Sequence, residues 1–280
     1  MTAEREARKY AIEAEVDKRR KQSEIRFHSI MNGESQTPTL LYPWLTVSDL
    51  MSHRENSSRG TLVVSLHTQS YFLLLLALDD AGLSCTAITT NELAGRLRAS
   101  RFRATGDLRF ESQLLPKSIR ECRSGERYFF MMADVLSPAG PNIMIPVFGR
   151  GMVYTVSWAR MAIRLQLNVL AAVLNDRGET ASVALRLLEG PFTDEFELAT
   201  QTFRAFDDAL GRDLSCWENE PPWTTYSAPL PDLSPDNDEE LIREIHLRSA
   251  CSHEVARRFL EIKRGGWPSV KPPPTPFPRS

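Results

Sequence analysis

The chain has 280 residues, of which 42% are hydrophobic, enough to fill one sizeable α/β core, so we expect one domain with additions at its ends. Its 34 Lys and Arg residues nearly balance 36 Asp and Glu residues, giving a net charge of -2. This balance provides no overall field that would favour nucleic acid or an anionic membrane surface as a partner. The four cysteines form no Cys-x-x-Cys pair, and no secretory signal pattern precedes them, so we expect reduced thiols in a cytoplasmic protein.

The N-terminal residues 1–27 are rich in helix formers, with opposite charges four positions apart, which predicts an exposed helix. Its apolar residues form only a thin stripe, made of Tyr10, Ile12, Val16 and Ile25. A membrane-surface helix is the alternative, but the interspersed acids favour a solvated face. A loop at 32–39 follows, and residues 1–44 together form a helix and loop ahead of the main domain.

Segments with the patterns of strands and helices alternate through the middle of the chain. Apolar, β-branched or aromatic runs predict strands at 61–66, 84–89, 127–134 and 142–149. Helical spacing predicts helices in the apolar run that ends at Ala81, and at 91–104 and 152–166. Two further apolar runs around DRG at 176–178 resemble a hairpin or two neighbouring strands. This alternation predicts an α/β fold in which helices flank a mostly parallel sheet.

The longest apolar run, YFLLLLAL at 71–78, is much shorter than the roughly 20 residues that cross a bilayer, so we expect no stable membrane insertion. Helical spacing recurs at 192–213, where Thr193 is available as the N-terminal cap. The chain is divided into a main domain at 45–231, a helical extension at 232–266 and a proline-rich tail at 267–280.

His67 directly follows the first predicted strand, and open α/β sheets bind their ligands at the carboxyl ends of their strands. A neutral imidazole there could take a proton from a hydroxyl or an amine of a substrate. The alternative is a histidine ring buried against the apolar helix that follows. The five histidines do not cluster as metal ligands and no serine lies in a G-x-S-x-G elbow, so we expect no metal, no cofactor and no hydrolase triad.

Several motifs occur in an order typical of one known family. They are GTLVVSLHTQSYF at 60–72, GERYFFMMADVLSPAGPNIMIPVFGR at 125–150, SWARMAIRLQLNVLAAVLNDRGETASVALRLLEGPF at 157–192 and TFRAFDDALGRDLSCWENEPPWTTY at 202–226. Over residues 45–226 the chain resembles the bacterial lipid A late acyltransferases, within the wider lysophospholipid acyltransferase superfamily. IPVFGR with its following helix is the most specific element of this resemblance.

The resemblance implies an acyltransferase fold with His67 as the catalytic base. In the family an acid five positions after the histidine orients its ring, but that position here is Phe72, which cannot accept a hydrogen bond. Asp134 ends a predicted strand and could replace that acid if the two strands are neighbours, although a capping or turn role is an alternative. We expect no counterpart of the family's membrane anchor, because the charged N-terminal helix stands in its place.

Further candidate substrate contacts flank these two positions. Ser70 lies close to His67 in sequence, and Phe72 would present an apolar ring in place of the family's acid. Gly149 permits close backbone approach, and the guanidinium of Arg150 could hold a phosphate or a carboxylate. An ion pair that fixes the loop is the alternative role for Arg150.

Three functional interpretations remain open. The first is transfer of an acyl group from an acyl-CoA or an acyl or peptidyl carrier protein to the amine or hydroxyl of a soluble small molecule, in a specialised biosynthetic pathway. The second is a degenerate relative that binds an acyl or carrier-protein partner without turnover. The third is different chemistry on a thioester-bound intermediate in the inherited cavity. We expect the first.

Overall fold

The computed structural model describes most of the chain between residues 3 and 222. The described ranges are 3–80, 82–88, 109–111, 116–135, 142–148, 150–211, 214–222 and 228–229, with short pieces between 238 and 260. The predicted helix at 91–104, the tail at 267–280 and most of the extension at 232–266 lie outside these ranges. Within them, no helix is both long and apolar enough to cross a membrane.

A mostly parallel sheet forms the centre of the described structure. Its seven strands lie in the order β1-β9-β8-β2-β5-β3-β4. Five of the six neighbouring pairs are parallel, and β8 and β9 form an antiparallel hairpin. The strands are β1 (Thr39–Leu41), β2 (Thr61–Ser65), β3 (Cys85–Ile88), β4 (Arg109–Glu111), β5 (Tyr128–Met132), β8 (Asn168–Asp176) and β9 (Thr180–Leu188). The predicted α/β class, the mostly parallel sheet and the hairpin are confirmed.

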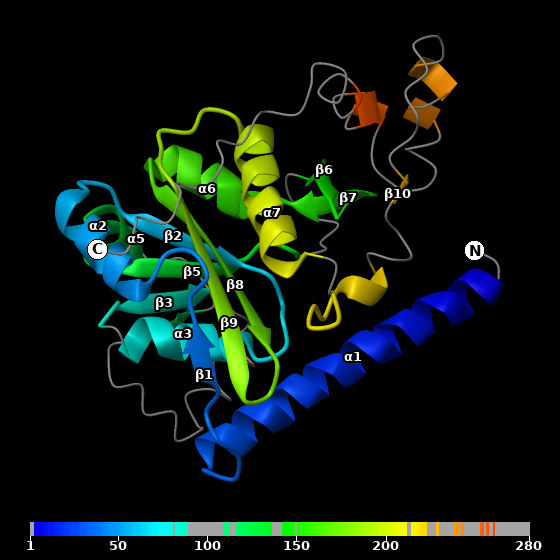
Figure 1. Cartoon of the computed structure of the whole chain (residues 1–280). Helices are drawn as coiled ribbons and strands as arrows, with labels where there is room; N and C mark the ends of the chain where they lie inside the picture. Colours follow the sequence, from blue (N-terminus) through cyan, green and yellow to red (C-terminus); the bar gives the residue numbers. More distant parts are fainter. Residues whose placement is uncertain are drawn as a thin grey trace.

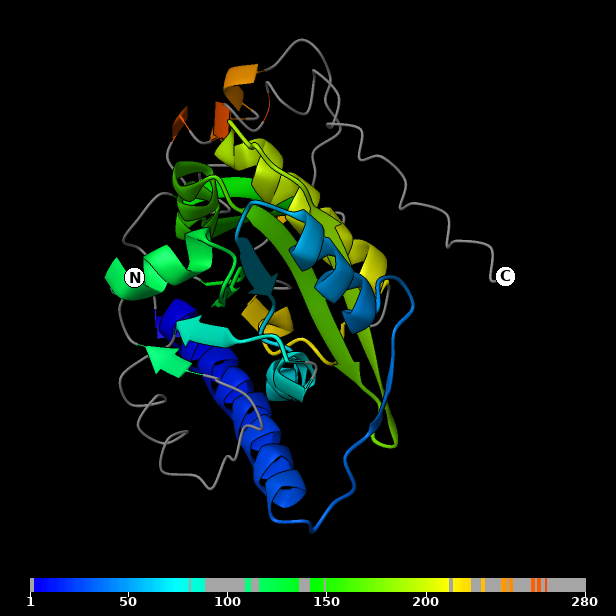
Figure 2. The same cartoon turned by 90° about the vertical axis from the view of Figure 1, so that its left-hand side faces the viewer.

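Helices cover both faces of this sheet (Figure 1). They are α1 (Ala3–Met31), α2 (Val47–Asn56), α3 (Tyr71–Asp80), α5 (Pro116–Arg123), α6 (Ser157–Leu165) and α7 (Glu195–Leu210). Side chains from α5, α6 and α7 pack into the apolar cluster on one face, and side chains from α1, α2 and α3 pack into the cluster on the other. The C-terminal half of α1, which includes Arg19, Ser23 and Phe27, lies against the domain near α3 (Figures 1 and 2). The N-terminal part of the helix extends away from the domain in Figure 1.

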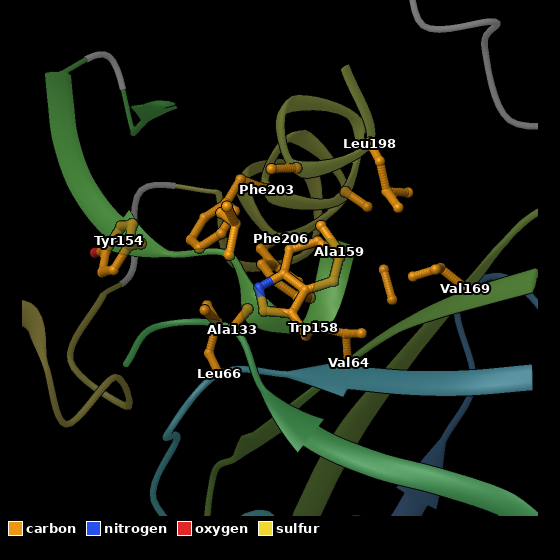
Figure 3. Packing of buried hydrophobic residues seen from close by; sticks show 14 of the residues in the cluster. Val64, Leu66, Ala133, Tyr154, Trp158, Ala159, Val169, Leu198, Phe203 and Phe206 are labelled. Atoms are coloured by element: carbon orange, nitrogen blue, oxygen red, sulfur yellow. The ribbon is translucent and has the colours of Figure 1, made fainter. Parts of the chain in front are cut away.

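The residues of β2 show why a strand forms here. Leu62 and Val64 enter the core cluster beneath α6 and α7, whereas Val63 enters the cluster beneath α3. Successive side chains of a strand point to opposite faces, so a strand covered on both sides must be apolar throughout. Figure 3 shows Val64 beneath Trp158 of α6, with Phe203 and Phe206 of α7 above it.

Two predicted elements are placed differently. The segment predicted as a fourth strand of the parallel sheet is β6 (Asn142–Val147), which instead pairs with β7 (Arg150–Thr155) and β10 (Ala228–Pro229) in a separate three-stranded sheet. The predicted helix at 152–166 begins only at Ser157, as α6. Val147 pairs with Arg150, so the two-residue connection brings β7 back as a hairpin, and pairing with β6 overrides the helical spacing.

The ends of two helices also differ from the predictions. The cap of α7 is Asp194, whose carboxylate accepts a hydrogen bond from the backbone N of Glu197 at 2.8 Å, so Thr193 is not the cap. The helix α1 continues to Met31, beyond the predicted end at residue 27. Tyr10 and Ile25 of its thin apolar stripe are 70% and 69% exposed, as expected for an exposed helix, whereas Ile12 and Val16 are partly buried. Phe27 and Ile30, in the last turns of the helix, are the buried residues that dock it.

Candidate active site

His67 and Asp134 come together because their strands are neighbours. β2 and β5 are parallel and adjacent, with Ser65 paired with Met132. His67 lies two residues after Ser65, and Asp134 lies two residues after Met132. His67 Nδ1 lies 2.7 Å from Asp134 Oδ1. The strand-end position predicted for both residues is therefore observed, and the condition under which Asp134 could orient His67 is met.

Four further donor contacts hold the Asp134 side chain, which is 1% exposed. The backbone N of His67 donates to both carboxylate oxygens at 3.1 Å. Trp217 Nε1 donates to Oδ2 at 2.7 Å, and Asn219 Nδ2 donates to the same oxygen at 2.9 Å. Burial alone would oppose ionisation, but His67 and these donors outweigh it and lower the pKa of Asp134. The site thus holds Asp134 as a carboxylate.

This carboxylate fixes the state of the His67 ring. Burial alone would lower the pKa of His67, but the charge and hydrogen bond of Asp134, with a contribution from Glu218, outweigh it and raise the pKa. When neutral, the ring donates its Nδ1 proton to Asp134, which leaves Nε2 as the acceptor. The side chain is 29% exposed, and no described residue makes a hydrogen bond to Nε2. The arrangement can therefore accept a proton from an incoming molecule.

Trp217 and Asn219 belong to a short irregular segment after α7 that also contains Glu218. Backbone hydrogen bonds of 2.7 Å from Glu218 N to His67 O and from Gln69 N to Cys216 O join this segment to the residues after β2. The segment 202–226, which carries part of the expected resemblance, contains Trp217, Glu218 and Asn219, but its sequence predicts no role for them. The only feature of the sequence that could have indicated a site here is the cluster of polar residues beside a tryptophan in CWENE at 216–220.

Glu218 is an acid buried beside the dyad, with 2% of its surface exposed. Its Oε1 atom makes no hydrogen bond with any described residue. Burial raises the pKa of Glu218 to about 7, and the charges of His67 and Arg20 moderate that rise. His67 therefore interacts with two acids whose pKa values are shifted in opposite directions, Asp134 downward and Glu218 upward.

The N-terminal helix takes part in this site, although its sequence predicts a solvated face. Arg19 Nη1 donates to the Trp217 carbonyl at 2.9 Å, and Arg19 Nη2 pairs with Glu220 at 3.0 Å. Ser23 Oγ accepts a hydrogen bond from the backbone N of Ser70 at 2.9 Å. One turn of α1 thus fastens both the segment after β2 and the segment after α7.

The other predicted site residues lie in different surroundings. Ser70 is buried and has φ of 65°, at the start of α3. The ring of Phe72 packs edge to face against Phe27 with centroids 4.5 Å apart, in the core beneath α1. Arg150 begins β7 in the smaller sheet, and Gly149 lies outside the described residues. Substrate contacts by these four residues stay predictions.

The described residues contain no group of three or more His, Cys, Asp or Glu side chains that could hold a metal ion. The fold and the dyad define an α/β protein with a paired histidine and aspartate at the carboxyl edge of a mostly parallel sheet. No protein-family model matches the sequence, and no curated protein matches it either.

Proposed function

We propose that the protein transfers an acyl group from a thioester, on coenzyme A or a carrier protein, to an amine or hydroxyl of a soluble small molecule. The observation that carries this proposal is the 2.7 Å contact between His67 Nδ1 and Asp134 Oδ1. It supplies the acid that the resembled acyltransferases place at the position of Phe72. A cytoplasmic location, where both kinds of thioester are available, is part of the proposal.

The reaction uses His67 first as a base and then as an acid. Nε2 takes a proton from the acceptor as its oxygen or nitrogen attacks the thioester carbonyl carbon. Asp134 stabilises the imidazolium that results, through its charge and its hydrogen bond to Nδ1. The tetrahedral intermediate then expels the sulfur, the C–S bond breaks, and the imidazolium returns the proton to the leaving thiolate. The products are an amide or ester and a free thiol.

The surroundings of Nε2 favour direct action on a substrate over a protein nucleophile. A serine or cysteine nucleophile would lie within hydrogen-bond reach of the base. Among the described residues, the only hydrogen-bond partner of the His67 ring is Asp134, and no serine, threonine or cysteine makes a hydrogen bond to it. The proton that His67 removes therefore belongs to the acceptor in our proposal.

The test is a thioester assay with the purified full chain. Acyl-CoA and acyl–carrier-protein donors of several chain lengths are incubated with panels of amines and hydroxyl compounds, and free thiol and acylated product are measured. We expect thiol release that depends on the acceptor, with product of matching mass. Thioester binding without thiol release by any pair would contradict acyl transfer and support a binding protein.

A further inference from the structure

Glu218 is a buried acid that the reaction above does not use. Its backbone N donates to the His67 carbonyl at 2.7 Å, and its side chain is 2% exposed. A hydrogen bond from Ser23 reaches the carboxylate, while Oε1 has no partner among the described residues. A buried, fully ionised carboxylate with so few donors is costly, so the neutral acid is favoured.

Three charged or titratable groups interact with this side chain. They are His67, Asp134 and Arg20 of α1. Asp134 and Arg20 also act on the His67 ring, and so does Glu218 itself. His67 and Glu218 therefore each respond to the charge of the other, while Asp134 stays ionised.

We propose that Glu218, which is buried and joined to His67 by a 2.7 Å backbone hydrogen bond, is a positioning residue that acts through His67 by sharing a proton with it. When the proton lies on Glu218, the carboxyl is neutral and Nε2 of His67 is free to act as a base. When it lies on His67, the imidazolium is hydrogen-bonded to the Asp134 carboxylate and also interacts with the charge of the Glu218 carboxylate. The proton only changes places, so the total charge of the site is the same in both arrangements.

This coupling has a consequence for titration. Two groups that interact strongly lose their protons in two steps that belong to the pair. Removing the Glu218 charge removes one of the influences that raise the pKa of His67, so His67 should then titrate in one step and at lower pH. Only the catalytic meaning of this coupling rests on the proposed acyl transfer, because the titration itself needs no substrate.

The experiment is an NMR titration of the His67 ring in the wild type, Glu218→Gln and Glu220→Gln. The ring signals are assigned by their loss in His67→Ala. We expect a two-step curve for the wild type and a single step with a lower midpoint for Glu218→Gln. The matched control, Glu220→Gln, removes a charge two residues away that pairs with Arg19, and its curve should follow the wild type. Identical single-step curves in all three proteins would overturn the proposal.

A second variant covers the case in which Glu218→Gln does not fold. The Ser23 hydrogen bond favours the ionised form of Glu218 and lowers its pKa, so Ser23→Ala should move the Glu218 step of the His67 curve to higher pH. An unmoved curve would contradict the coupling. If the thioester assay finds no transfer but these shifts are seen, the coupling stands and the acyl transfer fails, so the two claims are tested separately.

Discussion

His67 Nδ1 and Asp134 Oδ1 lie 2.7 Å apart although 67 residues separate them in the chain. Their contact depends on the pairing of β2 with β5, since each residue follows its strand by the same number of positions. The carboxylate that orients the histidine therefore comes from a neighbouring strand and not from the position five residues after His67, which is Phe72. This leaves the position of Phe72 free to pack in the core.

Asp134→Asn should weaken the base without removing the histidine. The amide lacks the charge that raises the pKa of His67, so that pKa falls and the acid limb of the rate profile moves to lower pH. The plateau rate should also fall, by roughly 10²–10⁴, because the imidazolium loses its stabilising charge. The check is the rate of thiol release between pH 5 and 9. Asp176→Asn, which removes a carboxylate paired with Arg26, serves as control, and an unchanged profile in Asp134→Asn would contradict the role of the dyad.

Trp217→Phe should destabilise the protein by about 1–3 kcal/mol, since the buried Asp134 carboxylate loses the donor that lies 2.7 Å from Oδ2. The phenyl ring can still pack against Phe148, whose ring centroid lies 5.3 Å from that of Trp217. The measurement is the free energy of unfolding in urea. Trp158→Phe is a matched control, because the buried Trp158 Nε1 makes no hydrogen bond with a described residue. If the two variants lost the same unfolding free energy, the hydrogen bond to Asp134 would contribute nothing beyond the effect of the smaller ring.

Phe72→Glu should not create a second dyad. Phe72 is 6% exposed and packs against Phe27, so a carboxylate there loses that contact and is buried among apolar side chains, at a cost of about 3–5 kcal/mol. His67 Nδ1 is also already paired with Asp134. Melting temperature and acyl transfer to a hydroxyl are measured together, with Phe72→Leu as the apolar control. A variant that folds like the wild type and gains strong transfer would mean that the chain is a disabled member of the ordinary family.

Glu218→Gln should change how stability depends on pH. The pKa of Glu218 is raised from 4.5 to about 7 in the folded protein, so between these values the unfolded chain releases a proton that the folded chain keeps. The stability that this group contributes therefore falls as pH rises through that window, by an amount on the order of 3 kcal/mol. Glutamine cannot ionise, so the wild type should lose more stability than the variant between pH 4.5 and 8. Parallel unfolding free energies over that range would contradict the buried acid.

The sequence predicts those parts of the fold that local patterns determine. The all-apolar run of β2 indicates a strand covered on both faces, and the rule that ligands bind at strand ends places His67 and Asp134 at one edge of the sheet. The hairpin of β8 and β9 follows from two apolar runs around a short turn sequence. In each case a few neighbouring residues carry enough information.

The remaining parts depend on contacts between distant segments. The apolar spacing of β7 is compatible with a helix, and its pairing with β6 and β10 decides the outcome. Glu218 and Trp217 lie in an irregular segment without periodicity, so nothing local shows that they contact the residues after β2. Arg19 has the charge pattern of a solvated helix, and its bond to the Trp217 carbonyl across 198 positions has no counterpart in the local sequence.

The most direct test of the proposed base is the rate of acyl transfer in His67→Ala. The matched control is His53→Ala, which removes a partly exposed histidine near Glu189. With the same thioester and acceptor, we predict that His67→Ala lowers the rate by roughly 10²–10⁴ while its folding and its affinity for the thioester are kept, and that His53→Ala retains the wild-type rate. A His67→Ala protein that transfers the acyl group as fast as the wild type would contradict the account.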